Sequence, residues 1–248
     1  MLRSRGRVLR VLGASPLTAD GLKWFRGAHA ELAVGRMLSR LDDGWTVLHA
    51  VPVGVRGADV DHLVVGPAGV FTINTKNHSG QRVWVGGKTF LVGGVKCDHI
   101  RKSEFEATRV ARLLSAAVGW EVPVRPVVAV FEPAKLEIKT RPTAVDVIST
   151  GSLLRWLRKK PAVLTADEVA RINAIIGLPS TWRRTPDDLA DLDRQDEFSA
   201  LRASVRQSTL LRRLWATAIG GTAAAGAIAA YPDTVHLIAR RLGELLGA

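Results

Sequence analysis

The chain has 248 residues, of which 47% are hydrophobic, and this excludes a largely disordered polypeptide. The formal net charge of +12 favours a polyanionic partner, either nucleic acid or an anionic membrane surface, although a solvated basic surface gives the same charge. The single cysteine, Cys97, excludes an internal disulfide and a cysteine-based zinc site.

The first half of the chain predicts one helix, a run of strands and a second helix. Residues 1–19 form a basic arm without an apolar run long enough for a signal peptide. Apolar residues three to four apart, Leu32 among them, predict a helix over residues 18–41. Strands are expected over residues 45–53, 60–65, 70–75, 81–85 and 89–92. The next helix covers residues 100–118, with Phe105, Val110, Leu113 and Leu114 pointing inward.

The second half predicts two further strands and two helices. An apolar, β-branched run predicts a buried strand over residues 125–131, and a second strand covers residues 144–148. Helices follow over residues 153–159 and 166–176, the latter with a capping box formed by Thr165 and Glu168. This order predicts an α/β domain over residues 20–178, in which helices flank both faces of a mixed sheet.

A polar linker or exposed helix is expected over residues 179–209, and a hydrophobic helical tail over residues 210–248. The run LWATAIGGTAAAGAIAAY, residues 214–231, has no charged residue and is slightly shorter than the ~20 residues of a membrane-spanning helix. Two interpretations stay open. The run anchors the domain to the inner, cytoplasmic face of a membrane, or it is an alanine-rich helix in water that packs on the domain or on a second copy in a homo-oligomer.

Polar residues gather at the open end of the predicted hairpin ADVDHLVVGPAGVFTINTKNHSG, residues 58–80. A four-residue loop at 66–69 places Asp61 opposite Asn74 and Asp59 opposite Lys76. Because side chains alternate between the faces of a strand, all four project from one face at one end. The remaining hairpin is apolar on both faces and is therefore expected to be buried.

Buried charges are costly unless they pair or bind a ligand, so the cluster has two interpretations. Asp61 and Lys76 form a structural ion pair, or the oxygen atoms of Asp61 and Asn74 bind Mg²⁺. In the second case Lys76 orients a water molecule or stabilises charge on a phosphate, and the chemistry is phosphodiester hydrolysis.

The hairpin, with the segments GAHAELAVGRMLSRL and EATRVARLL on either side of it, resembles the NERD family, the nuclease-related domain of the PD-(D/E)xK nuclease-like superfamily. The resemblance covers roughly residues 24–178. It implies that Asp61 is the metal-binding aspartate, that Lys76 is the catalytic lysine and that Glu31 is an acidic residue completing the site. Asn74 stands where the family pattern usually has glutamate.

The resemblance leaves two functions open. One is a nuclease that depends on Mg²⁺ or Mn²⁺, uses Glu31, Asp61, Asn74 and Lys76, and acts on nucleic acid, with DNA expected. The other is a binding protein or membrane-tethered scaffold with a degenerate site. An amide brings no charge to a metal, so the site is degenerate unless Glu31 or Asp59 supplies the missing charge. His62 is expected in the core and His78 near the mouth of the site. The residues expected to contact phosphates are Arg82, Lys88, Arg101, Lys102 and Arg109.

Overall fold

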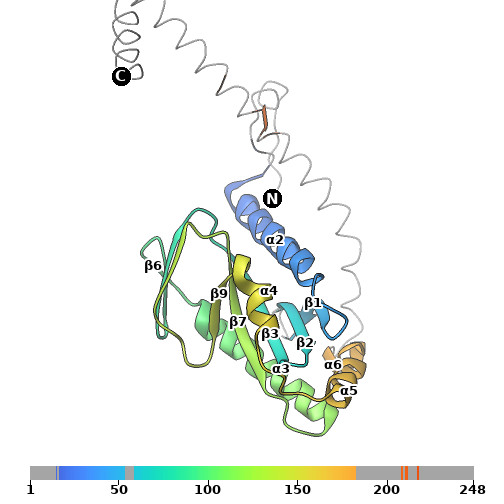
Figure 1. Ribbon diagram of the computed structural model, residues 1–248. Helices are drawn as coiled ribbons and strands as arrows, with labels where there is room; N and C mark the ends of the chain where they lie inside the picture. Colours follow the sequence, from blue (N-terminus) through green and yellow to red (C-terminus); the bar gives the residue numbers. More distant parts are fainter. Residues whose placement is uncertain are drawn as a thin grey trace, which may run out of the picture. The chain divides into compact units, whose positions relative to one another are not determined.

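The computed structural model describes residues 17–53 and 59–182, together with residues 15, 208, 210, 211 and 217 (Figure 1). From Lys23 to Trp182 the described elements belong to one compact unit. The elements follow in the order α2 (Ala19–Leu38), β1 (Thr46–Pro52), β2 (Asp59–Gly66), β3 (Gly69–Asn77), β4 (Arg82–Gly86), β5 (Thr89–Val92), β6 (Val95–Cys97), α3 (His99–Val118), β7 (Val124–Phe131), β8 (Lys135–Thr140), β9 (Asp146–Ser149), α4 (Thr150–Arg158), α5 (Ala166–Ile176) and α6 (Pro179–Trp182).

The strands form two sheets. The larger has the order β1-β2-β3-β7-β9, in which β1, β2 and β3 pair antiparallel while β3, β7 and β9 run parallel. The smaller has the order β6-β5-β4-β8. A mixed sheet flanked by helices is therefore confirmed, and the second sheet is an addition that the sequence pattern did not predict.

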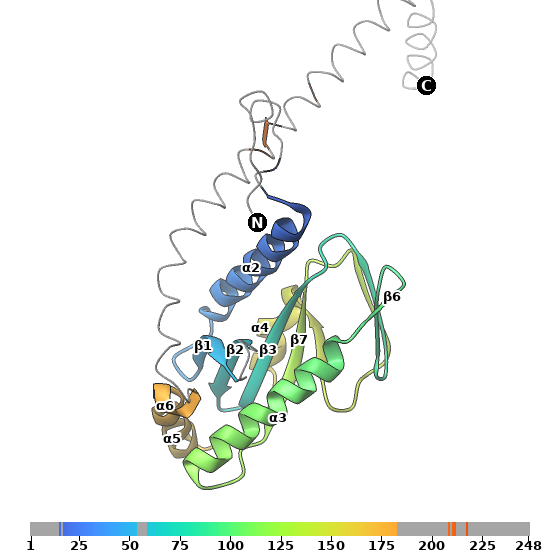
Figure 2. The same cartoon turned by 180° about the vertical axis from the view of Figure 1, so that it is seen from behind.

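Helices cover both faces of the larger sheet. In Figure 1, α2 and α4 lie in front of it, and Figure 2 shows α3 across the opposite face. One core packs Val64, Phe71 and Ile73 of the hairpin against α2 and α4. The other packs Leu63, Val65 and Val70 against α3 and α5. Because successive side chains of the hairpin point to opposite faces, one face packs into the first core and the other face into the second. Both faces are therefore apolar.

The hairpin register is confirmed for the pairs Leu63↔Thr72 and Val65↔Val70. Two glycines permit its turn. Gly69 has a φ of 115°, which side-chain-bearing residues rarely adopt. A Cβ atom on Gly66 would lie 2.4 Å from the Trp45 ring. The turn therefore fixes which residues face each other along the strands that carry the candidate site.

The smaller sheet is reached by two neighbouring chain segments. β3 leads into β4 and β7 leads into β8, and β4 pairs in parallel with β8 just as β3 does with β7. A β-bridge between Ser79 and Pro133 links the β3–β4 connection to the β7–β8 connection. The inner side of this sheet, with Phe90 at its centre, packs against Val128, Val130 and Ile100.

Several local predictions were wrong. Phe105, which was predicted to point inward, is 64% exposed. The buried stripe of α3 contains Ser103, Ala107, Val110 and Leu114, so Phe105, two residues after Ser103, falls on the far side of the helix. Strands β6 and β8 were not predicted. The capping box of α5 is confirmed, since the Thr165 hydroxyl accepts from the Glu168 N–H and the Thr165 N–H donates to the Glu168 carboxylate.

Among the described residues, no helix has both the length and the apolar character needed to cross a membrane. The proposed anchor at residues 214–231 lies outside the described residues, apart from Thr217. So do nearly all of the basic arm and of the linker beyond Trp182. These assignments, and the homo-oligomer, stay predictions.

Candidate active site

The candidate site begins where the ladder between β2 and β3 stops. At this end the last pair is His62↔Ile73. One residue further on, the Asp61 Oδ2 atom accepts a hydrogen bond of 2.6 Å from the Thr75 backbone N–H. The Asp61 carboxylate thus takes the place of a ladder partner and is held at the edge of β3. Burial raises its pKa, and Lys76 and the Thr75 hydrogen bond oppose that rise.

Asn74 connects the hairpin to α3. Its side chain is only 2% exposed, and its Nδ2 atom donates to the Glu106 Oε2 atom at 2.7 Å and, at the longer distance of 3.5 Å, to the Ser103 hydroxyl. A carboxylate only accepts hydrogen bonds, so the amide must turn its nitrogen toward Glu106 and its Oδ1 atom elsewhere. Glu106 therefore belongs to the site.

Sequence reasoning missed Glu106, although it lies in the quoted segment EATRVARLL. A signal was present. Ser103 and Glu106 are polar residues on or beside the stripe of α3 that is otherwise buried and apolar. Polar side chains on a buried stripe need partners, which is a reason to look for a site there.

Glu31 reaches the same place from α2. It is half-buried, and burial followed by the nearby charge of Asp61 raises its pKa to about 7, with Asp59 adding to the rise and Lys76 opposing it. Burial also raises the pKa of Glu106, against the Asn74 hydrogen bond and Lys76, while Asp61 raises it further. The carboxylates of Glu31, Asp61 and Glu106 thus all lie close enough to Lys76 for its charge to lower their pKa, and Asp59 acts on Glu31 and Asp61.

This arrangement suits a divalent cation. Burial raises the pKa of Glu31, Asp61 and Glu106, and a neighbouring carboxylate adds to each rise while Lys76 opposes it. Carboxylate and amide oxygens are the donors that Mg²⁺ prefers. Within residues 17–53 and 59–182, no three Asp, Glu, His or Cys side chains are already gathered as a metal cage. The donor types and the charge therefore fit the cation, and binding it would require these side chains to move closer to one another.

The raised pKa of Glu31 predicts a pH dependence of stability. The folded value of about 7 exceeds the ordinary 4.5, so the folded protein holds this proton more tightly than the unfolded chain. The resulting stabilisation is complete below about pH 4.5 and is lost as the pH rises through 7. Without divalent cations, Glu31→Gln should therefore raise the melting temperature relative to wild type at pH 8 and change it little at pH 4.5. A melting-temperature difference that does not vary with pH would contradict this prediction.

Four histidines of the domain form two pairs. The Nδ1 atoms of His49 and His62 lie 2.8 Å apart, and burial followed by His49 lowers the pKa of the buried His62 to about 3. The Nε2 atoms of His78 and His99 lie 3.1 Å apart, and burial lowers the pKa of His99 to about 4. Neither His62 nor His99 is therefore a cation at neutral pH. His62 lies in the core, as predicted.

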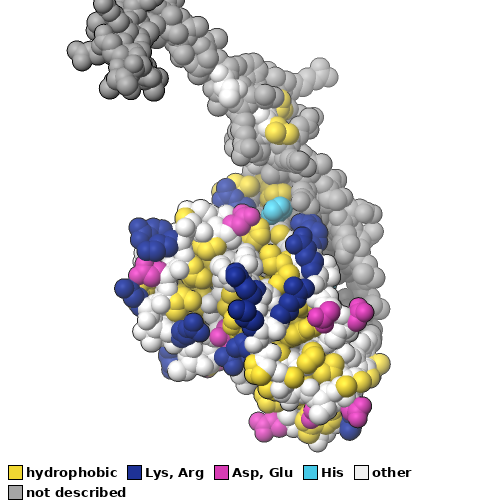
Figure 3. Space-filling view, in the orientation of Figure 1, with side chains coloured by type: hydrophobic (Ala, Val, Ile, Leu, Met, Phe, Trp, Pro, Cys, Tyr) yellow, Lys and Arg dark blue, Asp and Glu magenta, His cyan; other side chains and the backbone are white. Residues whose placement is uncertain are grey.

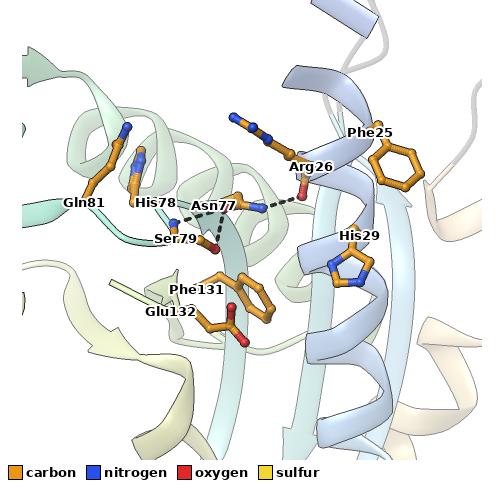
Figure 4. A pocket seen from close by; sticks show the side chains of 9 residues that line it. All are labelled: Phe25, Arg26, His29, Asn77, His78, Ser79, Gln81, Phe131 and Glu132. Carbon is orange, nitrogen blue, oxygen red and sulfur yellow. Dashed lines mark hydrogen bonds between the residues drawn. The ribbon is translucent and has the colours of Figure 1, made fainter. Parts of the chain in front are cut away.

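A pocket of about 430 Å³ lies between α2 and the carboxyl ends of β3 and β7 (Figure 4). Asn77, directly after Lys76, donates from Nδ2 to the Arg26 carbonyl at 2.6 Å and accepts from the Ser79 N–H and hydroxyl. Open α/β sheets bind ligands at such strand ends. The lining residues are Phe25, Arg26, His29, Asn77, His78, Ser79, Gln81, Phe131 and Glu132.

The basic residues predicted to contact phosphates are dispersed. Arg82 and Lys88 are exposed on the smaller sheet, and Arg109 is half-buried on α3. Arg101 forms an ion pair with Asp98. Lys102 lies close enough to Glu106 to lower the pKa of that carboxyl. Of the five, Lys102 has this direct electrostatic link to the candidate site.

Known proteins match part of this chain. Residues 26–131 match the nuclease-related domain family, NERD, and the match includes Glu31, the hairpin and Glu106. An uncharacterized protein of Bacillus anthracis is 36% identical over 88 residues, which are 34% of this chain and 40% of that protein. The chain thus spans less than half the length of that relative. No solved structure matches this chain. Residues 26–131 thus match the nuclease-related domain, NERD, a family that belongs to the PD-(D/E)xK-like nuclease superfamily.

Proposed function

We propose that this chain hydrolyses phosphodiester bonds in nucleic acid, with DNA as the first substrate to test, in a reaction that depends on Mg²⁺ or Mn²⁺. One observation carries the proposal: the Asn74 amide donates to Glu106 at 2.7 Å beside Asp61 and Lys76. The negative charge that Asn74 lacks is thereby supplied from α3. A site that would be one carboxylate short on the hairpin alone thus gains a carboxylate from α3.

The side chains have separate tasks in this proposal. The cation would be held by the oxygen atoms of Glu31, Asp61 and Glu106 and by the Oδ1 atom of Asn74. When bound, it lowers the pKa of an attacking water molecule and stabilises the charge that develops on the phosphate. The Thr75 N–H fixes the orientation of Asp61. The Lys76 ammonium adds a second positive charge where the phosphate becomes more negative.

A second candidate function is nucleic-acid binding without cleavage. It is favoured by the neutral amide at position 74 and by the absence of a gathered metal cage among the described residues. The net charge of +12 serves this function equally well. Binding alone does not separate the two functions, so the deciding measurement is cleavage.

The test incubates the purified full-length chain with end-labelled single- and double-stranded DNA and RNA, in Mg²⁺, Mn²⁺ or EDTA. Cleavage with either cation that is lost in EDTA supports the nuclease. Absence of cleavage of all four substrates overturns it in favour of binding without catalysis.

Asp61→Asn should weaken Mn²⁺ binding on the order of tenfold or more, because the affinity of an oxygen site falls with the charge of its ligands. The asparagine keeps an oxygen that can accept from the Thr75 N–H, so the fold should persist. Calorimetric titration measures the affinity and thermal unfolding checks the fold. The matched control is Asp98→Asn, an exposed carboxylate at the start of α3. Equal Mn²⁺ affinity in wild type, variant and control would remove Asp61 from the site.

A further inference from the structure

An exposed phenyl ring lies on the side of α3 that faces away from the sheet. The ring is that of Phe105, which is 64% exposed, and Figure 2 shows α3 across one face of the larger sheet. Helix geometry places Phe105 about 180° around the axis from the middle of the buried stripe. Single exposed apolar residues are common on protein surfaces, so the surroundings of this ring decide whether it marks a site.

Four cations surround the ring. Those one turn before it are Arg101 and Lys102, and those one and two turns after it are Arg109 and Arg112. Residues at these spacings share one side of a helix with Phe105. All four are exposed except Arg109, which is half-buried, and Arg101 stays exposed within its ion pair with Asp98. The Phe105 patch consists of Phe105, Arg101, Lys102, Arg109 and Arg112.

The Phe105 patch borders the candidate site. Glu106, which accepts from the Asn74 amide at 2.7 Å, directly follows Phe105 and lies about 100° from it around the helix axis. Between them around the axis is Lys102, whose charge opposes the burial that raises the pKa of Glu106. On a helix about 10–12 Å across, an arc of 100° spans roughly 8 Å. Neighbouring nucleotides of one strand can therefore contact both the candidate site and the ring.

Positive charge alone does not distinguish the Phe105 patch. Figure 3 shows Lys and Arg side chains on the opposite side of the domain, where α4 lies. The aromatic ring of α4, that of Trp156, is half-buried, packs against the core and has the Lys160 Nζ atom 4.3 Å from its centre. Among the described residues, none makes a ring–ring or cation–π contact with Phe105. The Phe105 ring is therefore available to a partner, whereas the Trp156 ring is already used within the fold.

The composition of the Phe105 patch favours an unpaired nucleobase over other partners of a basic surface. Insertion into lipid requires an apolar helix face, and the apolar face of α3, with Val110 and Leu114, is buried in the core. The centre of a protein interface is depleted of charged residues, whereas this ring has cations on both sides. A single strand matches the pattern, because its bases stack on aromatic rings and its phosphates bind cations. In a duplex the bases stack on one another instead.

We infer that Phe105 stacks on an unpaired base of the nucleic-acid strand held at the candidate site, while the cations of the Phe105 patch contact the phosphates beside that base. The inference rests on the proposed function and names its substrate class, a nucleic acid that is single-stranded next to the bond to be cut. Phe105 is thus a specificity-determining residue, which favours unpaired over paired substrate and takes no part in the hydrolysis itself.

The test measures binding of the full-length chain to three labelled probes of equal length by fluorescence anisotropy in EDTA. The probes are a single-stranded DNA, the corresponding duplex and a strand of the same sugar–phosphate backbone without bases. Phe105→Ala should bind the single strand at least about fivefold more weakly, because base–aromatic stacking is lost. Its affinity for the duplex and for the base-free strand should change less than about twofold, with an unchanged salt dependence, since no charge is removed.

Three further variants separate stacking from other effects. Phe105→Leu keeps an apolar side chain without a ring and should bind like Phe105→Ala, while Phe105→Trp should bind the single strand at least as tightly as wild type. The matched control is Val163→Ala, an apolar side chain that is 66% exposed near Gly69, at the turn end of the hairpin. The control should bind all three probes like wild type. Thermal unfolding confirms that every variant is folded.

Single-strand binding that Phe105→Ala leaves unchanged, or that wild type lacks altogether, overturns the inference. So does an equal loss on single strand and duplex, an equal loss in Val163→Ala, or wild-type affinity in Phe105→Leu. Loss of binding to phosphatidylserine vesicles by Phe105→Ala, with single-strand binding retained, overturns it in favour of a membrane. If wild type cuts nothing yet Phe105→Ala loses base-dependent binding, the stacking stands and the proposed nuclease falls. If wild type cuts and Phe105→Ala binds single strands like wild type, the nuclease stands and the inference falls.

Discussion

Replacing Lys76 by methionine should lower the rate of nucleic-acid cleavage by about 10²–10³-fold. Lys76 is half-buried, and its charge lowers the pKa of Glu31, Asp61 and Glu106. The substitution therefore removes the cation beside the phosphate and also makes the carboxylates harder to ionise. Nucleic-acid affinity should change only a few-fold, since a single phosphate contact is a small part of an electrostatic interface.

Single-turnover cleavage with enzyme in excess separates these two effects, and anisotropy in EDTA gives the affinity. The matched control is Lys96→Met, an exposed lysine in β6, which should cut at the wild-type rate. A Lys76→Met variant that is folded and cuts as fast as the control would show that the lysine has no catalytic task.

The substitutions Glu106→Gln and Asn74→Glu together move a carboxylate from α3 to the hairpin. They test whether the site needs the charge of Glu106 or its position on α3. Glu106→Gln alone should lower cleavage by about 10²-fold, because the site loses the charge that Asn74 cannot supply. Combining it with Asn74→Glu returns a carboxylate to the site. It also preserves the hydrogen bond in reverse, since the glutamine amide can now donate to the new carboxylate at position 74. The double variant should recover activity to within about tenfold of wild type.

A double-mutant cycle on single-turnover rates and on Mn²⁺ affinity measures this coupling. Asn74→Glu alone should be destabilised, since it places two carboxylates in a largely buried contact. Glu104→Gln, an exposed change on the same helix, is the control for lost charge. Recovery that fails in a folded double variant would mean that Glu106 positions Asn74 rather than binding the cation.

Local pattern was enough to predict the hairpin that carries the site. Alternating apolar residues and the glycines of its turn determine the register as far as His62↔Ile73. The ladder ends there, before the predicted pair of Asp61 with Asn74, and Asp61 accepts from the Thr75 N–H. The mixed sheet flanked by helices could also be predicted, because the order of strands and helices restricts the available architectures.

The features that the sequence pattern did not predict depend on contacts between residues distant in sequence. Glu106 enters the site because α3 packs across β3, and its hydrogen bond spans 32 residues. Strand β8, KLEIKT, is rich in charge and mostly exposed, so its own residue pattern does not predict a strand. The segment is extended because it pairs with β4. Phe105 was assigned inward because its side chain is large and apolar, although the helix places it on the exposed side.

The family likeness ends at residue 131, but the folded unit does not. Strand β7 closes the matched region, and beyond it β9 pairs along Val127–Val130, four residues that are 0% exposed. Leu153 and Leu157 of α4 and Ile172 of α5 fill the two cores. A chain cut at the family boundary would therefore carry an uncovered apolar strand as its sheet edge, the kind of surface on which other chains add and aggregate. A piece that keeps this edge and both cores covered extends through the helices that end at Trp182.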